Sequence, residues 1–363
     1  MVKIETIEWL KRYFARKDKK PFHRQISDIL RLIARYRSIP WQYLFYELYQ
    51  RDVTQEELLR YVSEIALYKR LCPIPNNNGE NHHLLLNNKI FFKQLMMANH
   101  VPVADTVLSL INGTFYDAGR LPLSRADALH LLQSAVCERI FLKYESGSNA
   151  ANISCLTRDQ GDGCFYSGST RVDTDFLEHL SRQGNHIFEQ GIVQHPLLSQ
   201  IHPSAVNTFR VITLFVPGYG PKILFCTLRM GRGNSVFDNL RAGGFSSWTR
   251  DKIPVGGLCA KVRVETSGLD TVAYDFYGNQ YKTHPDTGAL FEDQSFPFMN
   301  EILETCIHAA NAIPTLKAIG WDITYSENGP VMIEGNYRWG LTTIQYPNGG
   351  IADIIEHETG VRF

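Results

Sequence analysis

The sequence predicts an α+β fold with largely antiparallel sheets, and the order of its segments carries this prediction. Runs rich in β-branched and aromatic residues are typical of strands: RIFLKYE, NISCLT, HIFEQGI, TFRVITLFV, KILFCTLRM, AKVRVET and TVAYDFY. Helical segments are interspersed among these runs, and a long helix is expected over residues 298–312. Two final runs, IGWDITYS and GPVMIEGN, meet at the turn SENGP. Strand runs with interspersed helices favour the α+β class.

The first 70 residues, by contrast, read as helices. One apolar stripe at helical spacing consists of Ile26, Ile29, Leu30 and Ile33. Thr54 to Glu57 form a capping box, which opens a helix with the expected stripe Leu58, Val62 and Ile65. The Pro-, Asn- and Gly-rich stretch 72–83 then predicts a loop, in which His82 and His83 are expected to be solvated.

Two helices are expected before the first predicted strand. The run KIFFKQLMMANH stops ahead of Val101 and Pro102. A second helix begins at the cap Ser124 and carries the apolar positions Leu129, Leu132 and Val136.

Composition excludes several classes of protein. The 363 residues are 44% hydrophobic and carry 37 basic and 37 acidic side chains, so nucleic-acid binding is not expected. The longest apolar runs are too short for a membrane span, and the charged N-terminus MVKIETIEWLKRYF is unlike a secretory signal. Seven cysteines without a C-x-x-C pair favour a cytoplasmic location and argue against a zinc site.

The last two predicted strands offer oxygen ligands for a metal ion. Glu334 and Asn336 are two residues apart, so they point to the same face of their strand. Pairing centred on the turn would place Asp322 beside them. Three such ligands suit Mg²⁺ that is shared with a phosphate. The alternative is the polar outer face of a half-exposed hairpin.

A small-residue loop follows the strand that ends near Lys143. Its residues are Ser146, Gly147, Ser148 and Asn149. Their backbone N–H groups could surround phosphate oxygens, with the lysine as the counter-charge. Because the segment lacks the Walker pattern, an ordinary hairpin is the favoured interpretation of the loop alone.

Two further segments could contact a nucleotide. Glu189, Gln190, Gly191 and Ile192 end a strand through a glycine, where backbone groups could meet an adenine edge and Glu189 could bind its amino group. Arg210 lies within an apolar strand, and a buried arginine requires an anionic partner. That partner is either an internal carboxylate, or a phosphate or developing oxyanion.

Taken in this order along the chain, together with Lys89, these segments resemble the ATP-grasp superfamily. The sequence is most similar to its sugar-transfer-associated group, which is related to α-L-glutamate-ligase-like proteins. The phrases that carry the resemblance are NTFRVITL, DNLRAGG, HPDTG and GWDIT with GPVMIEGN. The resemblance covers roughly residues 85–350.

The resemblance implies two α+β lobes that hold ATP between antiparallel sheets. Residues 85–190 would form the small lobe and 191–363 the large lobe, after a helical region at 1–84. Lys89 and Lys143 would contact the phosphates, and the Ser146–Asn149 loop would close over them. Glu189, Gln190 and Ile192 would bind adenine. His195 stands near a position where relatives have an acid for the ribose.

The resemblance also implies the metal and catalytic residues. Asp322, Glu334 and Asn336 would bind Mg²⁺ or Mn²⁺. Arg210 would neutralise the transferring phosphoryl group, with Lys143 as the second catalytic cation. No nucleophilic side chain is required, because phosphoryl transfer depends on positioning and charge. Cys259 is expected to pack in a strand.

The substrate end is expected in the Gly- and Arg-rich stretch 229–245 and after the last strand. The candidates are Arg229, Arg232, Asn239, Arg241, Gly243, Gly244 and Arg338. Glycines let a loop approach a ligand closely, and arginines suit carboxylate or phosphate groups. The alternative for each arginine is an exposed surface position.

The N-terminal region departs from the family, since many ATP-grasp ligases begin with a Rossmann-like substrate domain. Its first 40 residues carry 11 Lys and Arg against 4 Asp and Glu. A solvated helical face is the favoured interpretation. The alternative is docking of an anionic, carrier-bound or lipid-linked substrate, which neutralising Lys17, Lys19 and Lys20 would test.

Three functions remain in competition at this stage. The leading one is an ATP- and Mg²⁺-dependent carboxylate–amine ligase that joins small-molecule substrates through an acyl phosphate, in polysaccharide or natural-product biosynthesis. The second is an ATP-grasp phosphotransferase acting on a small molecule or sugar. The third is a non-catalytic nucleotide-binding protein, against which the set of Lys143, Asp322, Glu334 and Asn336 argues.

Overall fold

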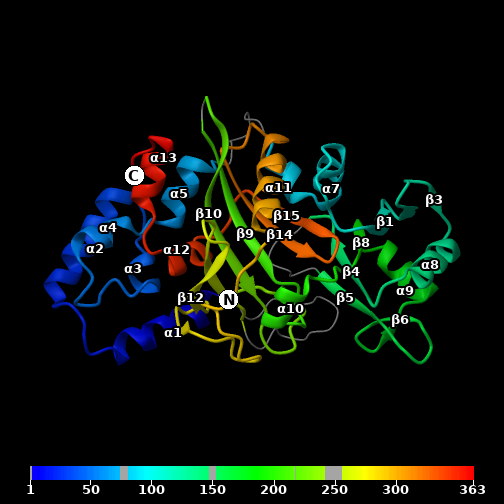
Figure 1. Ribbon diagram of the computed structural model, residues 1–363, viewed down its shortest axis with the longest axis horizontal. Coiled ribbons are helices and arrows are strands. Elements are labelled where there is room, and N and C mark those ends of the chain that lie inside the picture. The colour runs from blue at the N-terminus through cyan, green and yellow to red at the C-terminus, as the bar shows by residue number, and fades with distance from the viewer. Residues whose placement is uncertain (1, 74–80, 147–152, 217, 242–255) are drawn as a thin grey trace.

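The computed structural model describes residues 2–73, 81–146, 153–216, 218–241 and 256–363. Two antiparallel sheets with helices packed around them confirm the expected α+β class (Figure 1). The molecule is elongated, with the N-terminal helices at one end and the eight-stranded sheet at the other. The seven-stranded sheet lies between them.

The seven-stranded sheet has the order β13-β12-β11-β10-β9-β14-β15. Its strands are β9 (Thr208–Val216), β10 (Gly220–Met230), β11 (Leu258–Arg263), β12 (Gly268–Tyr274), β13 (Gln280–Tyr281), β14 (Ala318–Ser326) and β15 (Gly329–Asn336). Helix α11 (Met299–Asn311) packs against β9, β10 and β14, and confirms the long helix expected over 298–312. Helix α12 (Thr342–Asn348) packs against β10, β11 and β12.

The eight-stranded sheet has the order β3-β2-β1-β8-β4-β5-β6-β7. Its strands are β1 (Thr106–Ile111), β2 (Thr114–Asp117), β3 (Pro122–Leu123), β4 (Arg139–Tyr144), β5 (Ile153–Arg158), β6 (Phe165–Ser167), β7 (Thr170–Arg171) and β8 (His186–Gln190). Helices α8 (Arg125–Ser134) and α9 (Thr174–Ser181) contribute to its own apolar core. Short α10 (Pro196–Ile201) follows β8.

The remaining helices are α1 (Val2–Ala15), α2 (Phe22–Tyr36), α3 (Gln42–Phe45), α4 (Gln55–Arg60), α5 (Glu64–Leu71), α6 (Leu84–Asn87), α7 (Lys89–Ala98) and α13 (Ala352–Thr359). The first five do not form a core of their own. The buried apolar side chains of α2 to α5 belong to the same apolar cluster as the seven-stranded sheet, α11, α12 and α13. These helices are therefore packed against the seven-stranded sheet and its helices.

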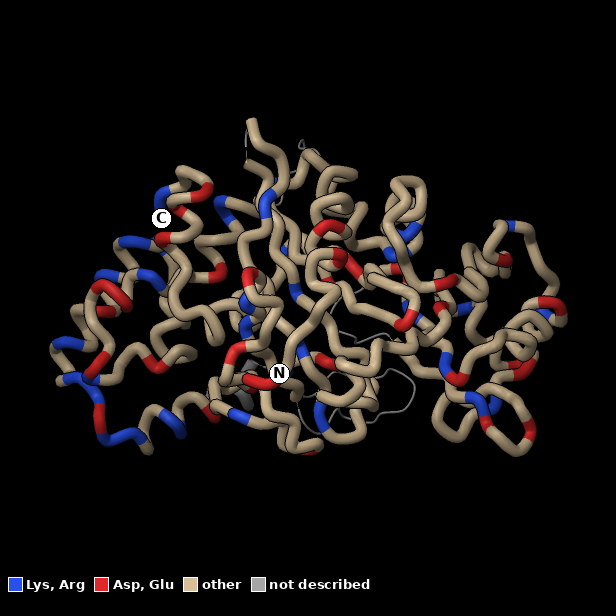
Figure 2. The backbone as a smooth tube through the Cα atoms, in the orientation of Figure 1, with Lys and Arg blue, Asp and Glu red and all other residues tan. Residues whose placement is uncertain are grey.

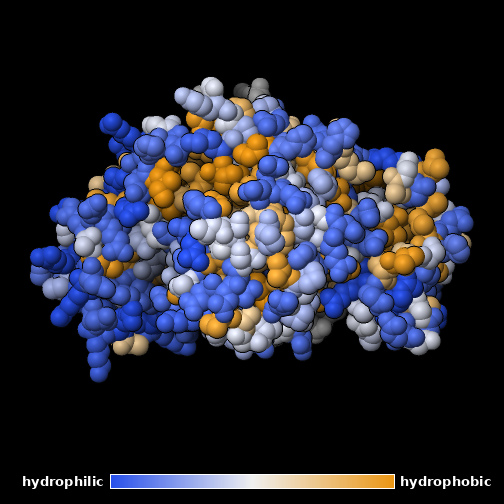
Figure 3. Space-filling view, viewed as in Figure 1, coloured by the Kyte–Doolittle hydropathy of each residue, from blue (hydrophilic) through white to orange (hydrophobic). Residues whose placement is uncertain are grey.

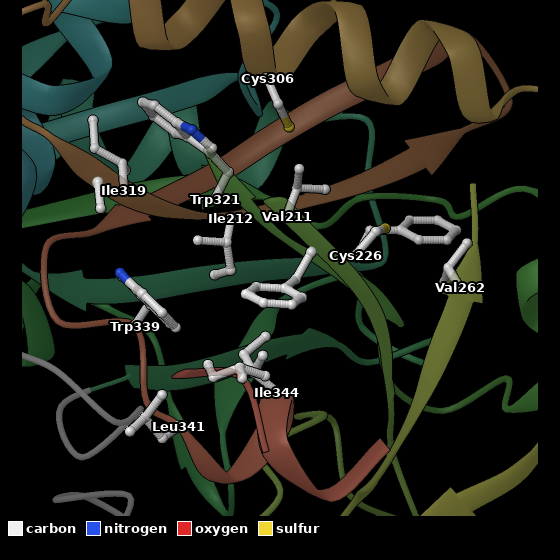
Figure 4. Packing of buried hydrophobic residues seen from close by; sticks show 14 of the residues in the cluster. Val211, Ile212, Cys226, Val262, Cys306, Ile319, Trp321, Trp339, Leu341 and Ile344 are labelled. Atoms are coloured by element: carbon white, nitrogen blue, oxygen red, sulfur yellow. The ribbon is translucent and has the colours of Figure 1, made fainter. Parts of the chain in front are cut away.

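The centre of this shared core lies behind the strands that carry the candidate metal ligands. Trp321 on β14 and Trp339 after β15 are both fully buried, and Ile212 and Ile344 pack in the same cluster (Figure 4). Because closely packed side chains resist displacement, this core holds the neighbouring strands in a fixed register. None of the helices in the described part of the chain combines the length and apolar character that a membrane crossing requires.

Short contacts join the two sheets near the cleft. Met332 on β15 donates a backbone hydrogen bond to the Pro102 carbonyl at 2.8 Å, and Val103 forms a parallel bridge with Met332. Helices α6 and α7 also pack against β15. The segment that enters the eight-stranded sheet is thus fastened to the edge of the other sheet.

Some local predictions are confirmed and others are wrong. Thr54 caps α4 by accepting a hydrogen bond from the Glu57 amide at 3.1 Å, as the capping box predicts. The chain breaks after α4, however, and Ile65 on α5 is exposed. Val136 lies beyond the end of α8 and is also exposed. His83 is half-buried, and one face of its ring stacks on Tyr337.

Most of the apolar stripe on α2 faces solvent rather than the core. The spacing correctly indicates a helix, but Ile26, Leu30 and Ile33 are exposed to solvent. The buried positions of α2 are Gln25, Asp28, Leu32 and Tyr36. Periodicity shows that a helix has an apolar side, but it does not show what that side contacts.

The hairpin of β1 and β2 was not predicted. Strands β1 and β2 pair around Asn112 and Gly113, which both have positive φ. An Asn-Gly pair between apolar runs is the sequence signal for such a turn, and it is present at this point.

Candidate active site

A cleft of about 980 Å³ lies where the two sheets face each other. Its walls come from α7, β4 and β8 on one side and from β9, β10, β14 and β15 on the other. Residues of α5 and of the segment after β15 close one end. The volume is at the upper end of the range for small-molecule sites.

Three adjacent strands bring the metal candidates and Arg210 together. The register pairs Asp322 directly with Glu334 on one side and with Arg210 on the other. Asn336 donates to Glu334 Oε1 at 3.1 Å and to Asp322 Oδ2 at 3.5 Å. The predicted hairpin pairing is therefore confirmed, and its polar face lines the cleft rather than the outer surface.

Asp322 is held by two arginines. Arg210 binds both of its oxygens, through Nε to Oδ1 and through a second nitrogen to Oδ2 at 2.9 Å. Arg229 donates to Oδ2 at 2.7 Å. Burial raises the pKa of Asp322, but the charges of Arg210 and Arg229 outweigh it and bring the pKa to about 2. Arg210 thus has an internal carboxylate as its partner, one of the two alternatives that the sequence left open.

Arg229 belongs to this network rather than to an open substrate loop. It also donates to Asp238 Oδ1 at 2.7 Å and to Asn239 Oδ1 at 3.0 Å. Asp238 in turn accepts a hydrogen bond from Thr208. The two arginines and two aspartates form a largely buried, charge-balanced network in the wall of the cleft.

Glu334 differs from Asp322 because it has no arginine contact among the described residues. Burial and the nearby charge of Asp322 raise the pKa of Glu334, and the positive charge of Lys89 opposes them only in part. A carboxylate that is under-compensated in this way fits a cation in the cleft. Within the described residues, no group of three or more His, Cys, Asp and Glu is arranged to hold a metal. A metal here would rely on two carboxylates and an amide, a set that suits Mg²⁺.

Two lysines converge on Glu189. Lys143 binds Oε2 at 2.5 Å, and Lys93 on α7 binds Oε1 at 3.1 Å. Burial raises the pKa of Glu189, but the two lysine charges outweigh it and bring the pKa to about 2. Lys89, at the start of α7, lines the same cleft, and burial lowers its pKa. The cleft therefore brings together the two predicted lysines, Lys89 and Lys143, with Lys93, which was not predicted.

The predicted adenine segment lies at the junction of the lobes. Gln190 donates its amide to the Asp105 carbonyl at 2.9 Å, and Gly191 donates to the Arg139 carbonyl at 2.8 Å. A Cβ on Gly191 would stand 2.9 Å from that carbonyl oxygen, so the close approach requires glycine. Ile192 lines the cleft with the apolar residues Phe141, Ile153 and Met332. These four apolar side chains are called the apolar slot.

Tyr68 on α5 connects two residues that line the cleft, Glu64 and Gly340. Its hydroxyl donates to Glu64 Oε1 at 3.0 Å and accepts from the Gly340 amide at 2.7 Å. The Arg338 guanidinium lies 5.4 Å from the centre of its ring. Glu64 and Arg338 both line the cleft. The helical N-terminal region therefore contributes a carboxylate to the site.

Other predicted residues are dispersed. His195 does not line the cleft: it caps α10, and its ring packs on Phe298 and Tyr325. Arg232 packs on Tyr281 and is also absent from the lining. Arg241 lines the cleft and lies over Phe276.

The predicted phosphate and acceptor loops are described only in part. Ser146 is exposed and forms an isolated bridge with Asn88. The other predicted loop residues lie outside the described residues: Gly147, Ser148, Asn149, Gly243 and Gly244. Cys259 is fully buried in β11, as expected.

Sequence reasoning missed four residues of the site. These are Glu64, Tyr68, Lys93 and Asp238. A signal existed for Lys93, because it follows Lys89 by four positions and so shares its helix face. Nothing local marks Glu64 or Tyr68, which reach the cleft only through tertiary packing.

The chain belongs to the sugar-transfer associated ATP-grasp family, whose match covers residues 73–356. The match begins directly after α5, so the first five helices precede it. No curated protein matches the chain.

Several solved structures match the chain at low sequence identity. The D-alanyl-alanine synthetase A from Vibrio cholerae is 13% identical, with a TM-score of 0.39, over 77% of this chain and 62% of that one. An L-amino acid ligase from Bacillus licheniformis is 14% identical, with a TM-score of 0.37, over 80% and 48%. Biotin carboxylase from Campylobacter jejuni is 14% identical, with a TM-score of 0.43, over 77% and 47%. The chain thus spans less than two thirds of each of these proteins, and likenesses at this level say nothing about activity.

Proposed function

We propose that the protein is an ATP- and Mg²⁺-dependent carboxylate–amine ligase. The observation that carries this proposal is the convergence of Arg210, Asp322 and Glu334 on three neighbouring strands, facing Lys89 and Lys143 across one cleft. Cations on one wall and metal-binding oxygens on the other suit a polyphosphate and its metal ion. Membership of the ATP-grasp family agrees with this arrangement.

The base of ATP would occupy the apolar slot beside Ile192, with the backbone of Gln190 at its edge. Lys89 and Lys143 would then bind phosphate oxygens, and Glu189 would position Lys143 for that role. Asp322, Glu334 and Asn336 would hold Mg²⁺, which supplies charge neutralisation at the phosphates. The Ser146–Asn149 segment is proposed to cover the phosphates.

The chemistry follows two displacements. A carboxylate oxygen of the donor attacks the γ-phosphorus of ATP and ADP leaves, which gives an acyl phosphate. The amine nitrogen then attacks the acyl carbon, inorganic phosphate leaves, and the nitrogen loses a proton as the amide forms. Arg210 uses three of its five N–H donors on Asp322 and the Trp339 carbonyl, so two remain for the transferring oxygen atoms.

The lining of the cleft favours this route over covalent catalysis by the enzyme. No serine, cysteine or histidine occurs among the described residues that line it. The proposed route needs no such nucleophile, because positioning and electrostatic stabilisation lower both barriers.

The acceptor end is proposed to lie at Glu64, Tyr68 and Arg338. The Glu64 carboxylate would bind the amine, and Arg338, with Arg241, would bind an anionic group of the donor or acceptor. The family's description favours a substrate that carries a sugar, from polysaccharide or natural-product biosynthesis.

Product analysis with ATP, Mg²⁺ and pooled amino acids and sugars tests the proposal. We expect ADP, inorganic phosphate and a new amide in equal amounts. A stable phosphorylated product with ADP would show a phosphotransferase instead. ATP that is bound but not consumed with any pool would contradict the ligase and favour a binding protein.

A further inference from the structure

The first two helices expose an unusual share of the apolar surface. Nineteen large hydrophobic side chains are exposed in the described part of the chain, and nine of these lie within the first 41 residues. On α2 they form one continuous stripe: Phe22, Ile26, Leu30 and Ile33. On α1 the exposed residues Ile7, Leu10 and Phe14 have helical spacing as well. We call residues 7–41 the α1–α2 surface.

The orientation of α2 is fixed by polar contacts on its buried side. Tyr13 donates to Gln25 Oε1 at 2.8 Å, and Lys20 binds Asp28 Oδ2 at 2.7 Å. Gln25, Lys20 and Asp28 are buried and Tyr13 is half-buried, whereas Phe22 is 74% and Leu30 60% exposed. A helix of a globular protein normally turns its apolar side to the core. Here the fold specifically holds that side outward, so the stripe is positioned to meet a partner.

The charges of the α1–α2 surface identify the partner. Lys11, Lys17, Arg24, Arg31 and Arg37 are all exposed. Acidic groups offer little compensation: Glu8 and Asp18 lie beside basic side chains, and Asp28 is buried against Lys20. Figure 2 shows several basic segments along α1, α2 and their connection. The face in Figure 3 is largely hydrophilic over these helices, in agreement with helices whose polar and apolar sides are separate.

An apolar stripe on a helix that is otherwise basic fits the surface of an anionic bilayer. We propose that the α1–α2 surface binds anionic lipid membranes peripherally, with the α2 stripe inserted at the acyl-chain boundary. Phe22, Ile26, Leu30 and Ile33 supply the apolar insertion, and the basic side chains supply attraction to lipid headgroups. The occupant is the bilayer itself, and this inference does not depend on the reaction in the cleft.

The basic residues best suited to a test are Arg24 and Arg31. Lys20 is buried against Asp28, and Lys19 donates to the Tyr13 carbonyl at 2.8 Å. Neutralising these two lysines would therefore disturb the fold as well as the charge. Arg24 and Arg31 are exposed, and neither has an acidic partner among the described residues.

Flotation with lipid vesicles tests the proposal without cell components. The full chain is mixed with vesicles of phosphatidylcholine alone, or of phosphatidylcholine with phosphatidylglycerol. The apolar variant is Ile26→Ser with Leu30→Ser, and the charge variant is Arg24→Gln with Arg31→Gln. The matched control is Leu121→Ser with Val136→Ser, which removes two exposed apolar side chains from the other end of the molecule. Circular dichroism and thermal unfolding verify that each variant is folded.

We expect the wild type to float with phosphatidylglycerol vesicles, and to bind more weakly to phosphatidylcholine alone and at high salt. The apolar variant should lose about tenfold or more in vesicle affinity, because two inserted side chains are removed. The charge variant should lose most of the preference for the anionic lipid, and the control variant should bind like the wild type. Absence of wild-type flotation, or equal flotation of the folded apolar variant, overturns the proposal. A wild-type dimer that becomes a monomer in the apolar variant, without vesicle binding, would assign the surface to a second copy.

Discussion

At the scale of single residues, Asp322 and Glu334 have different electrostatic environments, although the sequence predicts the same metal-binding role for both. Asp322 is enclosed by Arg210 and Arg229, and the pKa of this carboxyl falls to about 2. Glu334 stands one strand farther on, where burial and the charge of Asp322 raise its pKa and the charges of Lys89 and Arg210 offset them only in part. The first is a fixed anion within a network. The second gains most from a cation, and we therefore assign it the larger share of the proposed metal binding.

Glu334→Gln is expected to abolish Mg²⁺-dependent turnover while the protein stays folded. The loss should be about 100-fold or more, since the amide cannot neutralise a metal ion. Because the folded protein raises the pKa of Glu334, its ionised carboxylate destabilises the folded state at pH values above that pKa. This destabilisation is lost as the pH falls and the carboxylate takes up a proton. Without metal at pH 7, the variant should therefore unfold at the same or a slightly higher temperature than the wild type. Full Mg²⁺-dependent activity in the variant would refute the metal assignment.

Glu189→Gln, unlike Glu334→Gln, is expected to lower the stability of the folded protein. The change leaves Lys93 and Lys143 without their buried partner, which should cost about 3 kcal/mol at neutral pH. The pKa of Glu189 is lowered from 4.5 to about 2, so its stabilising effect is complete above pH 4.5 and is lost as pH falls towards 2. Urea unfolding at pH 7 and pH 3 should show a difference between variant and wild type that shrinks in acid. Exposed Glu327→Gln serves as the control, and a pH-independent difference would argue against the ion pair as the cause.

At the scale of elements, the sequence predicts what is local and misses what is distant. The β14–β15 pairing is predictable because the turn and both strands are contiguous, and the register then places Asp322 opposite Glu334. The contact of Lys93 with Glu189 spans 96 positions, and no local pattern encodes it. Likewise, the apolar spacing of α2 indicates a helix, but its burial is decided by Gln25 and Asp28. Element types are thus readable from periodicity, whereas the faces that meet depend on packing.

Helix α5 shows how one such distant contact shapes the site. Glu64→Gln is expected to raise the KM for the amine substrate several-fold, because the carboxylate that would bind the amine loses its charge. The KM for ATP should stay unchanged, since Glu64 is not among the residues proposed to bind ATP. Glu56→Gln, on the exposed first turn of α4, is the matched control. Steady-state kinetics with each substrate varied in turn would make the comparison, and a parallel rise in both KM values would exclude a specific acceptor role.

At the scale of the whole molecule, the N-terminal helices are part of the large lobe although the family match starts at residue 73. Gln345 on α12 bonds both backbone groups of Val62, at 2.8 and 3.2 Å. Tyr346 packs edge to face against Tyr46 with ring centres 5.0 Å apart, and Arg35 binds Glu356 at 2.9 Å. A shared apolar core with such cross-links indicates one cooperative unit. The family-matching region is therefore incomplete as a folding unit.

Removal of residues 1–72 is expected to yield insoluble protein or a chain without a sharp unfolding transition. The deletion would expose the side of the core that α2, α4 and α5 cover, and apolar patches of that size drive aggregation. Solubility after expression and thermal unfolding of any soluble fraction provide the measurement. Co-expression of residues 1–72 as a separate chain should restore solubility, because the lost contacts can form between two chains. A truncated chain that unfolds cooperatively at the wild-type temperature would contradict this prediction. It would show that the rest of the chain folds without the N-terminal helices.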